Sequence, residues 1–187
     1  MANWFIALPI PASPWFEALT PPPRNTRRFH PDDLHVTVAF LGDVGAERGR
    51  RAFDALRDHA IPARDVSLGR VVPMGAPRRW SALAAEVVDA SPCVPSLANV
   101  LTAPRDRGLE VAGAPAKARV MRPHVTIARV RRRKGGEGRR EALAWAETLE
   151  IDTRRLHLDR LALFTRADAD SDRTYRIVDE RPLADRA

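Results

Sequence analysis

The chain has 187 residues, of which 44% are hydrophobic and 29% are charged. This composition is that of a globular protein with a sizeable core, in one domain or two closely packed lobes, and excludes a disordered or fibrous chain. No apolar run reaches the length of a membrane span, the start lacks the basic segment of a signal peptide, and Cys93 is the only cysteine. We therefore expect a reduced, cytoplasmic protein with no membrane partner and no cysteine-based metal site.

The formal net charge is +7, which suggests an anionic partner. Of the 31 basic residues, all but two are arginine, whose planar fork binds two phosphate oxygens at once. The chain is also rich in alanine and proline, so genome composition explains the arginine bias equally well. Charge by itself therefore leaves both interpretations open.

The N-terminal part predicts strands that alternate with helices. Residues 4–10 form an apolar strand, 14–19 a short helical stripe stopped by three prolines, and 24–33 a polar loop. The β-branched run 34–41 predicts the next strand, and the apolar spacing within 46–60 predicts an amphipathic helix.

The same patterns continue to the C-terminus. Residues 66–72 and 80–88 predict two strands, and Ser91 or Ser96 can cap a helix with an apolar stripe through Leu101. A strand over 123–130, a basic loop over 131–136 and a helix around Trp145 follow. Residues 156–164 and 175–178 predict a closing hairpin around the turn 168–172.

Two of these strands carry the same pattern, His-hydrophobic-Thr-hydrophobic-Ala. The first is Leu34–Leu41, with His35 and Thr37, and the second is Pro123–Val130. Because alternate residues of a strand share a face, His35, Thr37 and Ala39 are predicted to point one way, and Val36, Val38 and Phe40 the other.

His124, Thr126 and Ala128 repeat this arrangement, with Val125 and Ile127 behind them. Arg129 falls in phase with those apolar residues, where a buried charge is costly without a partner. It therefore marks the exit of the strand to solvent or reaches an anion at the edge of a cleft, and we favour the anion.

The paired residues indicate acid–base chemistry on a phosphodiester. Imidazole titrates near neutral pH, so two histidines on one substrate can donate one proton and accept another. A threonine hydroxyl on the same face can donate to a non-bridging oxygen of a tetrahedral anion. His35, His124, Thr37 and Thr126 are thus the candidate site, and no third histidine or carboxylate stands at metal-ligand spacing near either pair.

These paired strands resemble the motifs of the two-histidine (2H) phosphoesterase superfamily, in particular its LigT-like RNA 2′,3′-cyclic phosphodiesterases, also called 2′-5′ RNA ligases. The resemblance extends to the opening strand Trp4–Leu8, to Phe40-Leu41-Gly42 after the first motif and to Arg129 in the second. Residues 161–164 through Tyr175 resemble the closing hairpin of that family.

The resemblance implies an α+β fold in one bilobal domain over 1–187. Two pseudo-symmetric lobes, each an antiparallel sheet with outer helices, would surround a central cleft lined by both motifs. It also implies metal-independent, cofactor-free hydrolysis of a nucleoside or RNA-terminal 2′,3′-cyclic phosphate to a 2′-phosphate. His124 would act as general base and His35 as general acid, while Thr37, Thr126 and Arg129 would bind the phosphate.

Two alternatives stay open. A 2′-5′ phosphodiesterase or RNA ligase would run the same in-line chemistry with a 5′-hydroxyl in place of water, or in reverse. A nucleotide-binding module would keep the cleft without turnover. We expect RNA ends or cyclic nucleotides as partners and a monomeric protein. The basic loop Arg131 to Lys134 is either a solvated loop or an RNA contact.

Overall fold

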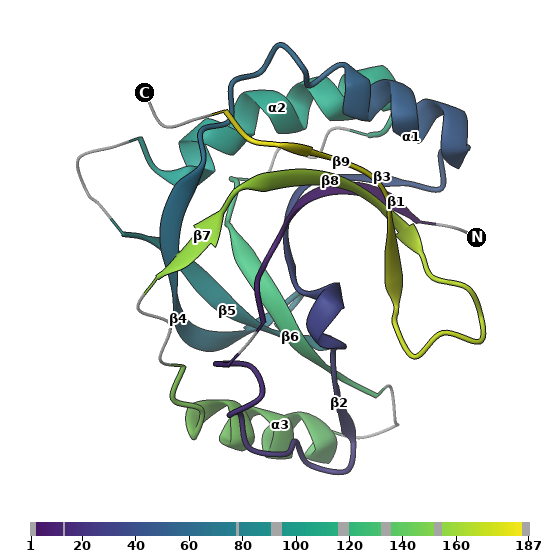
Figure 1. Cartoon of the computed structure of the whole chain (residues 1–187). Coiled ribbons are helices and arrows are strands. Elements are labelled where there is room, and N and C mark those ends of the chain that lie inside the picture. Colours follow the sequence, from purple (N-terminus) through teal and green to yellow (C-terminus); the bar gives the residue numbers. More distant parts are fainter. Residues whose placement is uncertain are drawn as a thin grey trace.

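The computed structural model describes residues 3–12, 14–77, 79–90, 95–115, 120–131, 136–151 and 155–184. Within these residues the chain forms a curled antiparallel sheet with helices on its outer side (Figure 1). The strands are β1 (Trp4–Pro9), β2 (Thr26–Arg28), β3 (His35–Gly42), β4 (Arg64–Met74), β5 (Ala82–Asp89), β6 (His124–Val130), β7 (Leu156–Leu158), β8 (Arg160–Arg166) and β9 (Tyr175–Pro182). The helices are α1 (Gly45–Asp54), α2 (Leu97–Ala112), α3 (Glu137–Glu147) and the short 3-10 helix η1 (Pro31–Asp33).

The sheet consists of two arms that meet at the two histidine strands. Its order is β7-β4-β5-β6-β3-β1-β8-β9, and β2 also pairs with β6. β3 and β6 are joined only where Val36 lies opposite Val125, and from there the two arms diverge. The α+β fold with two antiparallel lobes is therefore confirmed, and the lobes are continuous through one sheet.

The arms do not correspond to the two halves of the sequence. The β3 arm combines β1 and β3 with the C-terminal strands β8 and β9. The β6 arm combines β4, β5 and β6 from the middle of the chain with β2 and β7. Helices α1 and α2 pack on the outer side of the β3 arm, and α3 packs on the β6 arm (Figure 1). At Gly49 of α1, a Cβ would lie 2.8 Å from the ring of Trp4, so this close helix–sheet contact requires glycine.

Strand β1 is buried on both faces, which explains its unbroken apolar sequence. Ile6 and Leu8 belong to the main core under the helices. Phe5 and Ala7 belong to a second, smaller core with Phe164 on the other side of the sheet. This second core lies beside the histidine strands, so buried apolar side chains reach the edge of the candidate site.

Most predicted elements are found, and three predictions are wrong. The predicted polar loop 24–33 contains β2 and η1. The predicted single strand 156–164 is divided into β7, which pairs with β4, and β8, which pairs with β1 in the other arm. The predicted helical stripe at 14–19 is a series of turns, although its apolar residues are buried.

The helix ends also follow local rules. Ser96 caps α2 by accepting a hydrogen bond from the backbone N–H of Asn99, and Gly113 ends it in the left-handed conformation. The alternative cap Ser91 lies outside the described residues. No described helix is long and apolar enough to span a bilayer.

Candidate active site

A β-bulge in β3 changes which side chains face the site. Ala7 of β1 pairs with Thr37, but the preceding Ile6 pairs with Ala39, so Val38 is an extra residue. The prediction that Ala39 shares the face of His35 is therefore wrong, because Ala39 is buried on the helix side. Phe40, predicted to face the core, is instead 57% exposed and lies opposite Phe5.

β6 contains the same bulge at the equivalent place. Ala84 of β5 pairs with Thr126 and Leu83 pairs with Ala128, which leaves Ile127 as the extra residue. Ala128 is therefore buried, contrary to its predicted position beside Thr126, and Arg129 is exposed. The bulge turns Arg129 to the face of His124, so the arginine reaches the site without its charge being buried.

The register of β3 and β6 brings the four predicted site residues together. Since Val36 lies opposite Val125, the antiparallel register places His35 opposite Thr126 and Thr37 opposite His124. All four side chains are half-buried on one face of the sheet. On their other sides the threonines have the small residues Ala7 and Ala84 opposite them.

The two imidazoles are held in the same way. The Nδ1 of His35 lies 2.6 Å from the carbonyl oxygen of Asp33, and the Nδ1 of His124 lies 2.7 Å from that of Arg122. A carbonyl can only accept, so each Nδ1 carries the hydrogen and donates it. In each neutral ring the Nε2 is then left with a lone pair, in position to exchange a proton with a ligand.

The surroundings of the two rings differ. His35 packs against Phe5, Phe164 and Tyr175, with ring centroids 4.7, 5.3 and 5.6 Å away. Burial lowers the pKa of His35 to about 4, while the hydrogen bond and charge of Asp33 act in the opposite direction. Nearby His124 and Arg129 add smaller lowering effects. The ligand-free site thus holds His35 neutral at neutral pH.

Asp33 was not predicted as a site residue, yet it links three parts of the site. Its carboxylate is buried and accepts hydrogen bonds from the backbone N–H groups of Thr174 and Tyr175, at 2.7 and 3.0 Å. Its carbonyl accepts the hydrogen bond from His35. Asp33 therefore connects the β8–β9 hairpin, which carries the Tyr175 ring, to the segment that positions His35. The sequence contained one signal for Asp33, because an acidic residue stands two positions before a histidine that was predicted to lie in the site.

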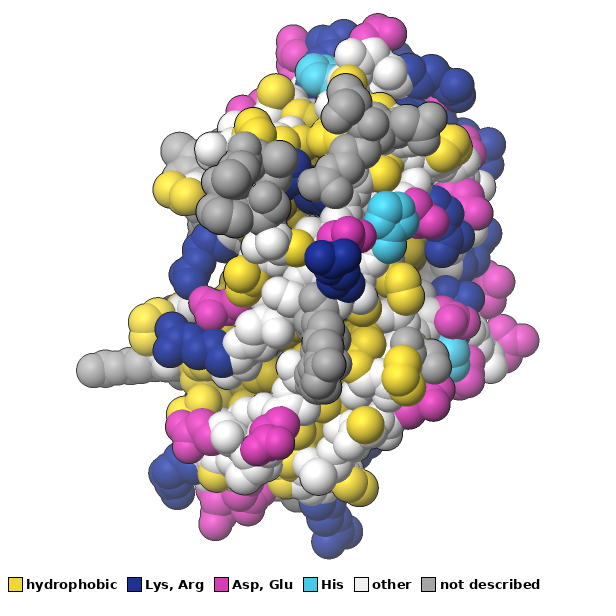
Figure 2. Space-filling model, turned by 60° about the vertical axis from the view of Figure 1, so that its left-hand side comes forward, with side chains coloured by type: hydrophobic (Ala, Val, Ile, Leu, Met, Phe, Trp, Pro, Cys, Tyr) yellow, Lys and Arg dark blue, Asp and Glu magenta, His cyan; other side chains and the backbone are white. Residues whose placement is uncertain are grey.

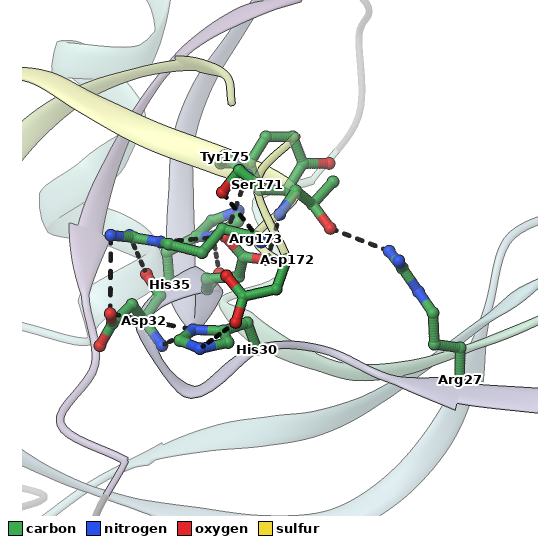
Figure 3. Close-up of polar contacts among 10 residues, drawn as sticks. Arg27, His30, Asp32, His35, Ser171, Asp172, Arg173 and Tyr175 are labelled. Carbon is green, nitrogen blue, oxygen red and sulfur yellow. Dashed lines mark hydrogen bonds and ion pairs between the residues drawn. The ribbon is translucent and has the colours of Figure 1, made fainter. Parts of the chain in front are cut away.

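Arg129 and Arg27 lie side by side on neighbouring strands, near the His35 end of the site. β2 pairs with β6 so that Arg27 is directly opposite Arg129. The guanidinium of Arg129 lies 5.8 Å from the centre of the Phe29 ring. Arg27 donates a hydrogen bond of 2.9 Å to the Thr174 hydroxyl on the β8–β9 hairpin, and so connects the two arms (Figure 3). Arg27 was missed because its strand was predicted to be a loop.

A cavity of about 870 Å³ opens beside Thr37 and His124. Its volume falls within the range of small-molecule sites. It extends away from the arginine end, and much of its wall is apolar. The lining includes Phe40, Met74, Leu109, Val120, Met121, Arg105 and Arg122.

Two further features of the sequence can now be placed. Among the described residues, no group of three or more His, Cys, Asp or Glu side chains converges in a way that could hold a metal ion. Of the basic loop Arg131 to Lys134, residues 132–134 lie outside the described residues, so its role stays a prediction.

The fold is that of the solved LigT structures, as the resemblance predicts. No family model matches the chain, and no curated protein matches it. Solved structures do. The apo structure of Escherichia coli LigT is 18% identical, covers 97% of this chain and 96% of its own, and has a TM-score of 0.66.

Two other solved structures agree. A structure described as a phosphoesterase is 20% identical, with 98% and 99% coverage of the two chains and a TM-score of 0.67. The protein TT0787 of Thermus thermophilus is 16% identical, with 97% coverage of each chain and a TM-score of 0.65. At these identities the likeness establishes the fold over nearly the whole chain, and the chemistry has to be inferred from the site.

Proposed function

We propose that this protein is an RNA 2′,3′-cyclic phosphodiesterase that hydrolyses a nucleoside or RNA-terminal cyclic phosphate to a 2′-phosphate. The observation that carries the proposal is the pairing of two His–Thr sets on one face of the sheet, with both Nδ1 atoms bound to backbone carbonyls. The fold supports a phosphoesterase activity in general. Escherichia coli LigT, which shares the fold, has been crystallised with 3′-AMP and with phosphate.

In the proposed reaction, a water molecule attacks phosphorus in line with the bond to the 3′ oxygen. The Nε2 of His124 accepts a proton from this water as the new P–O bond forms. The Nε2 of His35 gives a proton to the 3′ oxygen as its bond to phosphorus breaks, which leaves the phosphate on the 2′ oxygen. The hydroxyls of Thr37 and Thr126 donate to the non-bridging oxygens, and Arg129 stabilises the increased negative charge.

This assignment places a requirement on His35. With its pKa lowered to about 4 by burial, His35 is neutral in the ligand-free site and cannot act as an acid there. A phosphate anion bound at the two threonines raises the pKa of a neighbouring imidazole, because it stabilises the charged ring. We propose that substrate binding protonates His35 in this way. Without that effect the roles would be reversed, with His35 as the base.

Incubation with the four nucleoside 2′,3′-cyclic phosphates in the presence of a chelator tests the proposal. Phosphorus NMR identifies the position of the phosphate in the product. We expect turnover to a 2′-phosphate that persists in excess chelator. A 3′-phosphate product, or activity restored only by a divalent ion, would contradict the proposed chemistry.

The cavity beside His124 favours a second candidate function, a 2′-5′ phosphodiesterase or RNA ligase. Its volume of about 870 Å³ and its partly apolar wall with the exposed Phe40 would fit a nucleoside on the side where water attacks. In ligation, the 5′-hydroxyl of that nucleoside would replace water. In the reverse direction, cleavage, the neighbouring 3′-hydroxyl would attack phosphorus and give its proton to His35, and the 5′ oxygen would leave with a proton from His124. Cleavage of a 2′-5′-linked dinucleoside faster than a 2′,3′-cyclic phosphate would favour this function.

We also propose that the protein acts in the cytoplasm as a single bilobal domain over 1–187 and as a monomer. The residues of both motifs come from one chain and share one face of its sheet. Sedimentation of the purified protein tests the monomer, and a dimer at assay concentration would contradict it.

A further inference from the structure

Four arginines surround a second cavity, of about 710 Å³, between β2 and the β8–β9 hairpin. They are Arg27, Arg166, Arg173 and Arg176, and the only carboxylate in the described lining is Asp168. The remaining lining is mostly small or polar and includes the hydroxyls of Ser171 and Thr174. The cavity therefore offers an anion several positive groups and hydrogen-bond donors.

Most of these arginines have no carboxylate partner in the part of the chain that the structure describes. Arg173 lies within ion-pair distance of Asp32 and Asp33. For Arg27, Arg166 and Arg176, no carboxylate of the described residues lies within 4 Å. By contrast, acidic and basic side chains are intermixed over the face of the molecule shown in Figure 2. Part of the net positive charge of the chain therefore lies at this cavity, where three of the four arginines are not paired with a carboxylate of the described residues.

The register of β2 and β6 adds to the charge. Arg27 and Arg129 lie directly opposite each other on neighbouring strands. Like charges directly opposite each other destabilise a sheet. A bound anion would remove this repulsion, so the arrangement indicates a ligand with more than one negative group.

The cavity adjoins the histidine site. Arg166 is paired in register with Tyr175, whose ring centre lies 5.6 Å from that of His35. Arg27 is next to Arg129, which lies on the face of His124. A chain leaving the histidine site toward the hairpin would therefore reach Arg27 and Arg166 first. Arg176 lies between Tyr175 and Ile177 on the other face of the edge strand β9, so the chain would meet it at the edge of the sheet.

We propose that Arg27, Arg166 and Arg176, named here the hairpin patch, bind backbone phosphates of single-stranded RNA next to the reacting end. The lining favours phosphate contacts, because its groups are mainly cationic and polar, and its one described aromatic side chain, Trp4, is buried in the core and offers no exposed platform for a base. The inference rests on the proposed function and specifies its substrate as an oligonucleotide end in preference to a mononucleotide.

A pair of charge-matched double variants of the full chain tests this proposal. R166Q/R176Q removes two charges from the patch. R48Q/R50Q removes two charges from exposed arginines of α1, on the outer side of the sheet. The probe is an eight-nucleotide RNA with a 3′-phosphate, and its dissociation constant is measured over a series of salt concentrations. For single strands, the slope of log K against log salt is about −0.7 per phosphate contacted.

We expect R166Q/R176Q to flatten the slope by about 1.4, the value for two lost phosphate contacts, and R48Q/R50Q to keep it. The charge-retaining variant R166K/R176K should also keep the slope, which separates loss of charge from misfolding. An equal change in both glutamine variants, or no change in either, would overturn the proposal.

Kinetics separates this inference from the proposed function. For substrates ending in a 2′,3′-cyclic phosphate, R166Q/R176Q should raise KM for the octanucleotide about tenfold more than KM for the mononucleotide. Equal effects on the two would overturn the hairpin patch. Failure of the unmodified protein to hydrolyse either substrate would refute the proposed function, and the binding slopes would still decide the patch.

Discussion

The two histidine strands use the same backbone geometry in different surroundings. From His35 to Leu41 and from His124 to Val130 the pattern of burial is the same, residue by residue, with a bulge at the same place. Each histidine donates its Nδ1 hydrogen to the carbonyl two residues before it. Strand geometry thus fixes which atoms of the two imidazoles face the ligand.

The side chains around each strand then make the two histidines different. His35 is packed among aromatic rings, whereas His124 lies opposite Glu86, which is itself within ion-pair distance of Arg70 and Arg122. Two positions after the extra residue of each bulge, the first strand has Phe40 and the second has Arg129. A symmetric backbone with asymmetric neighbours is what an acid–base pair requires, because its two members must differ in protonation.

Removing either imidazole should have the largest effect. His35→Ala and His124→Ala should each lower kcat about 10³-fold or more, because each removes a proton-transfer group. The fold should be kept, because the neighbouring Val36 and Val125 are the buried residues. Steady-state kinetics and circular dichroism measure both.

In the double variant the two losses should not add, because the pair acts as a unit. Additive losses would contradict the joint action of the two strands.

The threonines should show a smaller and more symmetric effect. Thr37→Ala and Thr126→Ala should each lower kcat by about one to two orders of magnitude, since each removes one hydrogen bond to the developing charge. The register places the two hydroxyls in equivalent positions, so we expect similar losses in similar assays. A loss confined to one variant would show that only one strand holds the phosphate.

Asp33 distinguishes the two strands, because only the first carries a buried carboxylate two positions before the histidine. Asp33→Asn keeps the backbone carbonyl but leaves one N–H of the hairpin facing an amide N–H. We expect kcat to fall about tenfold, as for a slightly displaced positioning contact. The pKa of His35 should also fall further, because the charge of Asp33 raises it.

NMR titration of the imidazole measures the pKa of His35. If Asp33 had only a structural role, this pKa would be the same in Asp33→Asn. The matched control is Arg122→Ala on the second strand, where the histidine uses only the backbone oxygen. It should change kcat far less than Asp33→Asn. Equal effects would show that neither side chain acts through its histidine.

Much of the site could be predicted from the sequence, because period-two alternation identifies the shared face of His35 and Thr37. The two β-bulges could not be predicted, because an extra residue in a strand leaves no recognisable change in the pattern of apolar residues. Ala39, Phe40, Ala128 and the orientation of Arg129 depend on them.

Strand β2 was not predicted, for a related reason. Its three residues are held by pairing with β6 and contain no apolar alternation. The pairing of β3 with β6 could not be predicted from the sequence either, because the register of two strands that are distant in the chain is set by the packing of the whole core.

The burial of His35 should also appear in stability, as the smallest effect. The pKa of His35 is about 4 in the folded protein and about 6.5 in the unfolded chain. Between these values the unfolded state binds more protons, so the free energy of unfolding falls as pH decreases from 6.5 to 4. The contribution is on the order of 3 kcal/mol.

Urea unfolding at pH 7, 5 and 4 measures this contribution by comparison with His35→Asn. The stability of the variant relative to the unmodified protein should rise as pH falls, because the variant lacks the titrating ring. Parallel pH dependence in the two proteins would show that His35 titrates normally in the fold.

The most direct test of the central claim, that the two histidines divide the acid and base roles, uses a phosphodiester with a much better leaving group. Such a substrate no longer needs a proton on the leaving oxygen. We predict that it restores most of the lost rate to His35→Ala and little of it to His124→Ala. Rescue of His124→Ala alone would reverse the roles, and rescue of neither would contradict proton transfer to the leaving oxygen.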